Sequence, residues 1–373
     1  MKILHTAAFY PPRSGGAEEV VRQLSERLVA RGHSVTVATT AIPERTFTEL
    51  NGVAVRGFMI SSPFNHTAFG ISGEVDDFMR FVATGNFDIV MNYAAQTWGT
   101  DLTCRLLGKL KAKTVLAACG FSGLTGRRRL IYRNYFRRLP RYLKLYDAVV
   151  YHVNGYIDEK FGRAHGVRHS LVIPNAVDAA EFAAPQIDFR QKYNIHTKYM
   201  VLAVGNHFRN KGHARIIEAF HLMKRKDTTL VIIGRDIAPR LRSCWRSCQR
   251  AYAGKVVLVQ SAPRCDVSAA FAAADVFVSG SYFEVFPLVL LESMASQTPF
   301  VSFSAGNAAQ LAGGVIVNSA REMATGTQRL LDCKALRGKL GCEGKQQQEQ
   351  KFEWETVVDQ YESLYQSLLA RRA

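Results

Sequence analysis

Hydrophobic residues follow two different periods along this chain. Short runs rich in β-branched residues, such as "KILHTAAF" at 2–9, precede segments with apolar residues three to four positions apart, such as 17–31. The first pattern is typical of buried parallel strands, and the second is typical of helices that cover them. The sequence therefore predicts an α/β fold with parallel sheets and helical crossovers.

The alternation occurs in two rounds. The further strand candidates of the first round are "HSVTVATT", "FDIVMNY", "KTVLAAC" and "YDAVVYHV". Those of the second are "YMVLAVGN", "TTLVIIG", "KVVLVQS", "ADVFVSG" and "PFVSFSA", with helices over 212–225 and from about 287. Ligands bind at the carboxyl ends of strands in such sheets. Two rounds predict two Rossmann-like, doubly wound domains that face a cleft.

A turn followed by a linker separates the two rounds. The stretch "VIPNAVDAAEFAAPQIDF", 172–189, has turn residues and then alanines and a proline. We predict an N-terminal domain over 1–178, a C-terminal domain over 179–351, and a helix over 352–373 that packs back on the N-terminal domain. The apolar positions of this helix are Trp354, Val357, Val358, Tyr361, Leu364 and Leu368.

Charge is the unusual feature of the composition. The 373 residues are 47% hydrophobic and 21% charged, as in soluble globular proteins, but the net charge is +17. Such a charge implies an acidic partner: nucleotide phosphates, nucleic acid or an anionic membrane. No RRM, KH or zinc-finger signature is present, so we expect no nucleic-acid partner. No long apolar segment suggests export or membrane insertion, and we expect a cytoplasmic protein.

The seven cysteines include no CxxC pair, which favours reduced thiols over a disulfide framework. Cys244 and Cys248 lie one helical turn apart in "LRSCWRSCQR". A metal site would need two further ligands beside them, and the sequence does not reveal any. We therefore expect no metal site.

Two loops that follow predicted strands are candidates for anion binding. "FYPPRSGGAEEVV" contains Gly15 and Gly16, which let backbone N–H groups approach an anion at a helix N-terminus. "AVGNHFRNKGHARIIEAF" contains Arg209 and Lys211, and a lysine there could hold a diphosphate. A glycine-rich turn without a ligand and an exposed basic loop are the alternatives.

A third candidate is "SYFEVFPLVLLESMASQTPF", 281–300. Pro287 suits the first position of a helix, which would leave the N–H groups of Leu288 and Val289 free for a phosphate. Glu284 precedes this helix, and Glu292 lies one turn deeper on the face of Leu288. The two acids could bind hydroxyls on both sides of a diphosphate, as in a nucleotide sugar, although this spacing also arises by chance.

These stretches together resemble glycosyltransferase family 4, whose members have the GT-B fold. Glu284 to Glu292 is similar to its E-x7-E motif, and "VGNHFRNKGH" and "VIPNAVDAAEF" follow its order. The resemblance implies that Lys211 binds the donor diphosphate, Glu292 the ribose and Glu284 the donor sugar. It also implies phosphate binding by the backbone of Phe286, Leu288 and Val289, and a close approach of Gly15 and Gly16 to the donor.

Three features depart from the family pattern, and one is the family's "GFG" within the E-x7-E stretch, which reads Val285-Phe286-Pro287 here. Asn206 stands where the family usually has an arginine, which leaves Arg209 as the candidate substitute. "LAACGFSG" places Cys119 and Gly120 where a histidine often contacts the donor sugar. A catalytically inactive GT-B scaffold and a GT-B epimerase therefore stay open as alternatives, beside a basic nucleic-acid-binding protein.

The activity that the resemblance implies is a retaining hexosyl transfer from a UDP- or GDP-type sugar, without cofactor or metal. The sequence contains no D-x-D triplet, which is consistent with a metal-independent site. The acceptor implied is an oligosaccharide or a lipid-linked glycan of bacterial cell-surface polysaccharide synthesis. Catalytic roles fall on Lys211, Arg209 and Glu284, and substrate-binding roles also on Asn206.

One basic segment suggests where the protein works. "GRRRLIYRNYFRRLPRYLKLYDAVV", 126–150, has no acid before Asp147, and apolar and aromatic residues lie among its arginines. This pattern is typical of a helix that lies on an anionic membrane, although an ordinary solvated basic helix is the alternative. We predict docking through 127–144 on the inner face of the cytoplasmic membrane, with Pro140 dividing the helix.

Overall fold

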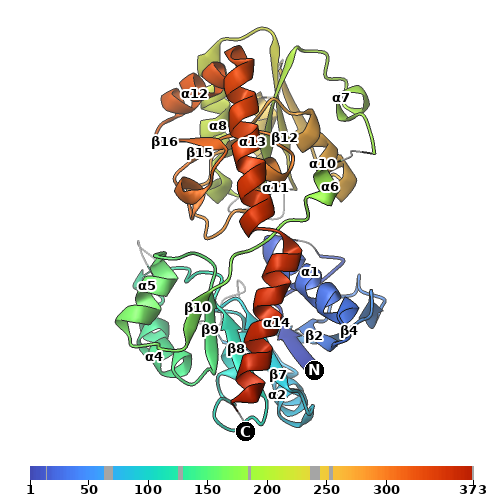
Figure 1. Cartoon of the computed structure of the whole chain (residues 1–373), viewed down its shortest axis with the longest axis vertical. Coiled ribbons are helices and arrows are strands. Elements are labelled where there is room, and N and C mark those ends of the chain that lie inside the picture. The colour runs from blue at the N-terminus through green and yellow to red at the C-terminus, as the bar shows by residue number, and fades with distance from the viewer. Residues whose placement is uncertain are drawn as a thin grey trace. The chain divides into compact units, whose positions relative to one another are not determined.

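Parallel strands form two main sheets in the computed structural model of the chain (Figure 1). The structure describes residues 1–13, 15–62, 70–124, 129–183, 186–235, 244–251 and 255–371. The chain divides into unit 1, which is Met1–Asn175 with Trp354–Ala373, and unit 2, which is Ala176–Glu353. Each unit has one large parallel sheet with helices as crossovers, so the predicted α/β class with two doubly wound domains is confirmed.

The sheet of unit 1 has the strand order β10-β9-β8-β7-β1-β2-β4-β3, and only β3 runs antiparallel to its neighbour. Its strands are β1 (Lys2–Thr6), β2 (Ser34–Thr40), β3 (Glu49–Leu50), β4 (Val53–Phe58), β7 (Ile89–Tyr93), β8 (Lys113–Ala117), β9 (Ala148–Tyr151) and β10 (Ser170–Val172). β5 (Ile60–Ser61) and β6 (Ser72–Gly73) form a separate small hairpin. All five residues of β7 are buried, as expected for a central strand with both faces covered.

Among the residues that the structure describes, six helices belong to unit 1. They are α1 (Gly16–Ala30), α2 (Val75–Thr84), α3 (Trp98–Thr103), α4 (Arg133–Leu143), α5 (Ile157–Ala164) and α14 (Trp354–Ala370). α4 lies within the arginine-rich segment 127–144 for which a helix is predicted, but Pro140 lies inside it and does not divide it. Proline removes one backbone donor, and the helix ends three residues later, so the cost of that missing bond falls on its last turn.

The last helix, α14, packs on unit 1 beside α1 (Figure 1). Its buried face includes five of the six predicted apolar positions, with Tyr365 fully buried where Leu364 was expected. Arg31, the C-cap residue of α1, donates to Glu355, Asp359 and Glu362 of α14 over 2.5–2.9 Å. The burial of this stripe and the three ion pairs together fix the helix on this unit.

The sheet of unit 2 is fully parallel, with the order β13-β12-β11-β14-β15-β16. Its strands are β11 (Tyr199–Val204), β12 (Thr228–Ile233), β13 (Val256–Val259), β14 (Val276–Ser279), β15 (Phe300–Phe303) and β16 (Gly314–Val317). In chain order this is the 3-2-1-4-5-6 arrangement of dinucleotide-binding folds. The order reverses between β11 and β14, and ligands bind at such a point, beyond the carboxyl ends of the strands.

The helices of unit 2 complete its crossovers. They are α6 (Ala180–Ala183), α7 (Phe189–Lys192), α8 (His213–Met223), α9 (Trp245–Ala251), α10 (Arg264–Ala273), α11 (Leu288–Ala295), α12 (Ala320–Asp332) and α13 (Lys334–Lys351), with one-turn 3-10 helices at η4 (Arg209–Lys211) and η5 (Ala308–Gln310). None of the described helices in either unit is both long enough and apolar enough to cross a bilayer. Because the strand order of unit 2 reverses between β11 and β14, the loops after these two strands are where we expect its chemistry.

Candidate functional site

The loops after β11 and β14 lie side by side at the point where the strand order of unit 2 reverses. Their close approach depends on Gly212 and Gly280. Gly212 has a φ of +65°, and a Cβ there would collide with the carbonyl oxygen of Gly280. A Cβ at Gly280 would in turn lie 2.6 Å from the carbonyl oxygen of Gly212. Glycine at both positions therefore lets the two loops touch.

Lys211 and Glu284 meet across this contact. The Nζ atom of Lys211 lies 2.7 Å from Oε1 of Glu284, although 73 positions separate them in the sequence. The Lys211 side chain is 32% exposed and that of Glu284 is 15% exposed. The structure thus brings together the residue predicted to hold a diphosphate and the one predicted to hold a sugar.

Two residues that the sequence did not single out hold the loops in register. The side-chain amide of Asn210 donates to the backbone carbonyl of Phe283 over 2.9 Å. The backbone carbonyl of Asn210 accepts from Tyr282 N–H over 2.8 Å. Arg215 donates to the carbonyls of Gly280 and Ser281 over 2.6 and 2.7 Å.

The Arg215 guanidinium also stacks between two aromatic rings, 3.7 Å from the centroid of Tyr282 and 3.6 Å from that of Phe303. Burial lowers its pKa, an effect that the Tyr282 side chain partly offsets. A planar cation with several donors suits this role, because it can stack and bond to two carbonyls at once. Arg215 therefore positions the loop that carries Glu284.

Helix α11 begins one residue later than predicted. Pro287 is the residue before the helix, with an extended ψ of 104°, and Leu288 is the first helical residue. The backbone N–H groups of Leu288 and Val289 still lack a carbonyl partner within the helix, because the first such bond runs from Leu290 to Pro287. Phe286 is buried, and its ring packs edge-on against Phe352 at 5.6 Å.

Glu292 is buried on α11 and paired with a cation. Arg264, the first residue of α10, donates to its Oε1 over 2.5 Å and to Glu181 over 2.7 and 2.9 Å. The pairing holds the carboxylate in one orientation. A carboxylate has about four acceptor positions, so capacity for hydroxyl groups remains. Arg264 is a third residue that sequence reasoning missed, since its partners are 28 and 83 positions away.

The loop after β11 contains two further predicted residues, Asn206 and Arg209, and their surroundings differ. Asn206 accepts a hydrogen bond from Arg235 N–H over 3.2 Å, which ties the loop after β11 to the end of β12. Arg209 is exposed, and its side chain forms no hydrogen bond with the described part of the chain. Arg209 is therefore available to a ligand, whereas Asn206 already has a structural partner.

Gly15 and Gly16 lie in unit 1, at the N-terminus of α1. A Cβ at Gly15 would collide with the carboxyl group of Glu18, which folds back over the helix end. Burial raises the pKa of Glu18, and the backbone hydrogen bond that it accepts opposes this. An acid of this chain therefore already occupies the place that the sequence predicts for an anion. The approach of Gly15 and Gly16 to the donor stays a prediction.

Cys119 follows β8 of unit 1, where the family often has a histidine. It has a left-handed backbone with a φ of 51° and is half-buried. The next residue, Gly120, donates its N–H to the buried carboxylate of Asp158 over 3.0 Å. Asp158, in the first turn of α5, therefore fixes this turn. Cys119 offers a thiol at the position where the family has an imidazole.

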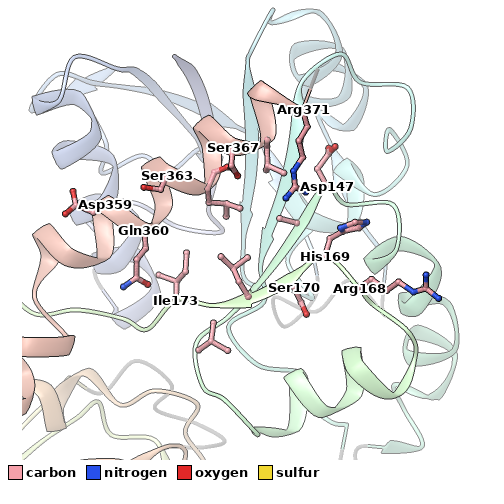
Figure 2. Close-up of a pocket in the computed structure, with 15 residues that line it drawn as sticks. Asp147, Arg168, His169, Ser170, Ile173, Asp359, Gln360, Ser363, Ser367 and Arg371 are labelled. Atoms are coloured by element: carbon pink, nitrogen blue, oxygen red, sulfur yellow. The ribbon is translucent and has the colours of Figure 1, made fainter. Parts of the chain in front are cut away.

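A pocket of about 620 Å³ in unit 1 is separate from all of these residues (Figure 2). It lies between the edge strand β10 and α14, and its charged lining groups include Asp147, Arg168, Asp359 and Arg371. None of the predicted site residues lines it. The residues predicted to carry the chemistry therefore lie outside this pocket, most of them in or beside the loops after β11 and β14 of unit 2.

One assumption behind the expectation of no metal site is wrong. The expectation rested on the lack of further ligands near Cys244 and Cys248, but the structure places His207 and His213 beside them. The sequence shows these histidines only as neighbours of Lys211, and the signal that was missed is an H-x5-H pair upstream of a C-x3-C pair.

Comparison with known proteins agrees with this geometry. Residues 14–181 match the family model "Glycosyltransferase Family 4", and residues 185–347 match "Glycosyl transferases group 1". An uncharacterized glycosyltransferase of Methanocaldococcus jannaschii is 26% identical over 395 residues and covers 98% of both chains.

Solved structures share the fold. Sucrose-phosphate synthase from Thermosynechococcus elongatus has a TM-score of 0.84 and 21% identity, over 99% of both chains. HepE from Anabaena, solved with UDP-glucose, has a TM-score of 0.81 and 17% identity, over 98% of this chain and all of its own. With both family models in chain order and GT-B structures as neighbours, this chain belongs to the family 4-type glycosyltransferases.

Proposed function

We propose that this glycosyltransferase moves a hexose from a nucleoside-diphosphate sugar, with retention of configuration, to a lipid-linked glycan in bacterial cell-surface polysaccharide synthesis. The observation that carries the donor part is the contact of Lys211 with Glu284, which lies in the loop that leads into α11. The loops thus bring together a cation and a carboxylate, and the first turn of α11 adds two backbone N–H groups that lack a carbonyl partner in the helix. This is the set that a sugar linked to a diphosphate requires.

The chemistry follows from where charge develops. As the bond between the sugar and the β-phosphate breaks, negative charge grows on the leaving diphosphate. Lys211 and the positive end of α11 are fixed in advance by the loop contacts, so they stabilise that charge without reorganising. Glu284 accepts hydrogen bonds from sugar hydroxyls, and Glu292 accepts them from the ribose.

The donor can be identified by thermal unfolding in the presence of UDP, GDP and their sugars. HepE of Anabaena was solved with UDP and with UDP-glucose, which favours a uridine donor here. A ligand at about a hundred times its Kd stabilises the folded state by about 2.7 kcal/mol. We expect one nucleoside diphosphate to raise the Tm clearly, and a chain that responds to neither contradicts the proposed donor class.

Chelation should leave the reaction intact. Among the described residues, neither Glu284 nor Glu292 belongs to a group of three or more potential metal ligands. We therefore expect full initial rates after brief exposure to EDTA, because cationic side chains and a helix terminus replace the usual divalent ion. Progress curves with and without EDTA measure this, with the metal content followed in parallel. Loss of turnover that Mg²⁺ or Mn²⁺ restores would show a catalytic metal.

The acceptor part of the proposal rests on the surface of α4. The predicted amphipathic helix exists, but its apolar face packs inward: Phe136, Leu139 and Leu143 are buried in the core of unit 1. The solvent-exposed face of this segment is basic, and no acidic residue lies between 129 and 144. The exposed basic residues are Arg129, Arg133, Arg137, Arg138, Arg141 and Lys144.

Two apolar side chains border this basic face. Leu130 is 81% exposed and Ile131 is 57% exposed. A surface of this kind binds anionic lipid by charge, with a small apolar contribution, and not by immersing a whole helix face. Arg127 and Arg128, which belong to the predicted segment 127–144, lie outside the described residues.

Charge reversal on α4 should abolish binding to anionic vesicles. Each basic residue near such a surface contributes about 1 kcal/mol, so Arg137→Glu, Arg141→Glu and Lys144→Glu together weaken binding by at least about a hundredfold. Co-sedimentation with phosphatidylglycerol vesicles at low and high salt is the measurement. The matched control reverses Arg105, Lys109 and Lys111, which are also exposed in unit 1. Equal sedimentation of both triple variants, or none by the unmodified chain, contradicts membrane docking through α4.

A further inference from the structure

Four potential metal ligands gather in unit 2, beside the loop that carries Lys211. They are His207 from the loop after β11, His213 at the start of α8, Cys244 just before α9 and Cys248 within α9. All four are buried, with at most 7% of any residue exposed. Their ligand atoms all lie within 4.8 Å of one another.

Four distances between these atoms are close to those of a tetrahedral zinc site. With Zn–N of about 2.0–2.1 Å and Zn–S of about 2.3 Å, tetrahedral angles place two nitrogens about 3.3 Å apart and a nitrogen and a sulfur about 3.6 Å apart. The two histidine Nδ1 atoms are 3.3 Å apart. The Sγ atom of Cys244 lies 3.7 Å from Nδ1 of His207 and 3.3 Å from Nδ1 of His213, and Sγ of Cys248 lies 3.8 Å from the latter.

The type and spacing of the ligands also favour zinc. Two thiolates and two imidazoles, with no carboxylate among them, suit Zn²⁺ and not Mg²⁺ or Ca²⁺. The pairs His207-x5-His213 and Cys244-x3-Cys248 have spacings typical of structural zinc sites. Two thiolate charges cancel the charge of the ion, so the occupied site can be buried without net charge.

A hydrogen-bonded cluster of neutral side chains is the alternative explanation. Thiols are weak donors, however, and the two Nδ1 atoms that face each other can share only one proton favourably. A metal ion satisfies all four atoms at once. The geometry therefore points to a ligand at the centre of the four groups.

We propose that this chain binds one Zn²⁺ through Nδ1 of His207 and His213 and Sγ of Cys244 and Cys248. Binding releases the two thiol protons and forms four metal–ligand bonds, with no position left for water or substrate, so the site is structural. The two histidines flank residues 208–212, which include Arg209 and Lys211. The ion thus joins both ends of this loop to α9, whatever ligand the loop binds.

The metal content of the untagged full-length chain, purified under reducing conditions, tests the site. We expect about one zinc per chain by elemental analysis, and a loss of about tenfold or more in a Cys244→Ser/Cys248→Ser variant. The matched control is Cys342→Ser, which changes an exposed cysteine on α13 and should keep the full zinc content.

A second measurement does not depend on the variant folding. Replacement of the metal of the unmodified chain by Co²⁺ should give the visible bands of tetrahedral cobalt and a thiolate charge-transfer band. The absence of zinc together with the absence of these bands overturns the proposal, as does a disulfide between Cys244 and Cys248 in the reduced preparation. Zinc that the double variant retains in full also overturns it, because the ion then lies elsewhere.

Discussion

Replacement of Lys211 by alanine is expected to lower kcat by about a hundredfold or more, with a smaller effect on donor affinity. The Lys211 ammonium lies 2.7 Å from Glu284, which is in the loop that leads into α11. Charge on the leaving diphosphate is larger in the transition state than in the bound donor. A fixed cation therefore stabilises the transition state more, and its loss appears mainly in kcat.

The measurement separates turnover from binding. Steady-state rates give kcat, and calorimetry with the nucleoside diphosphate gives Kd. Lys226→Ala is the matched control, since Lys226 is an exposed lysine of unit 2 away from these loops. We expect Arg209→Ala to resemble Lys211→Ala with a smaller loss. An unchanged kcat with only a weaker Kd would mean that Lys211 binds ground state and transition state equally.

Replacement of Glu292 by alanine is expected to weaken donor binding by up to about a hundredfold. Ribose hydroxyls that lose their acceptor in a buried site cost about 1–3 kcal/mol. Glu292 is 6% exposed, so water replaces the carboxylate poorly. Arg264 keeps its second carboxylate partner, Glu181, and the variant should therefore still fold.

Calorimetry with UDP and GDP measures this effect directly. Glu349→Ala, on the exposed face of α13, is the control for loss of one acid in unit 2. Arg264→Ala tests the orientation of the carboxylate: it should weaken binding less than Glu292→Ala, because the acceptor oxygens remain. Equal donor affinity in the unmodified chain and the Glu292→Ala variant would remove the ribose role.

Hydrophobic periodicity determined the fold class and most strands of the two main sheets. Central strands are buried on both faces, so they appear as continuous apolar runs that sequence patterns reveal. This pattern did not predict β4, in which buried and exposed residues alternate, because the apolar run is weak. It also did not predict the edge strand β10, because that strand is short. Loop residues such as Lys211 and Glu284 could be named individually, since loops after parallel strands carry chemistry.

Only the tertiary structure decided which of these residues meet. Lys211 contacts Glu284 because β11 and β14 became neighbours in the sheet, and strand order is not written in any local pattern. The basic segment shows the same limit: its periodicity predicted an amphipathic helix but not that the apolar face would pack inward. The histidine and cysteine pairs were each visible in the sequence. Their convergence depends on the packing of α9 against α8, which joins segments 31 or more residues apart.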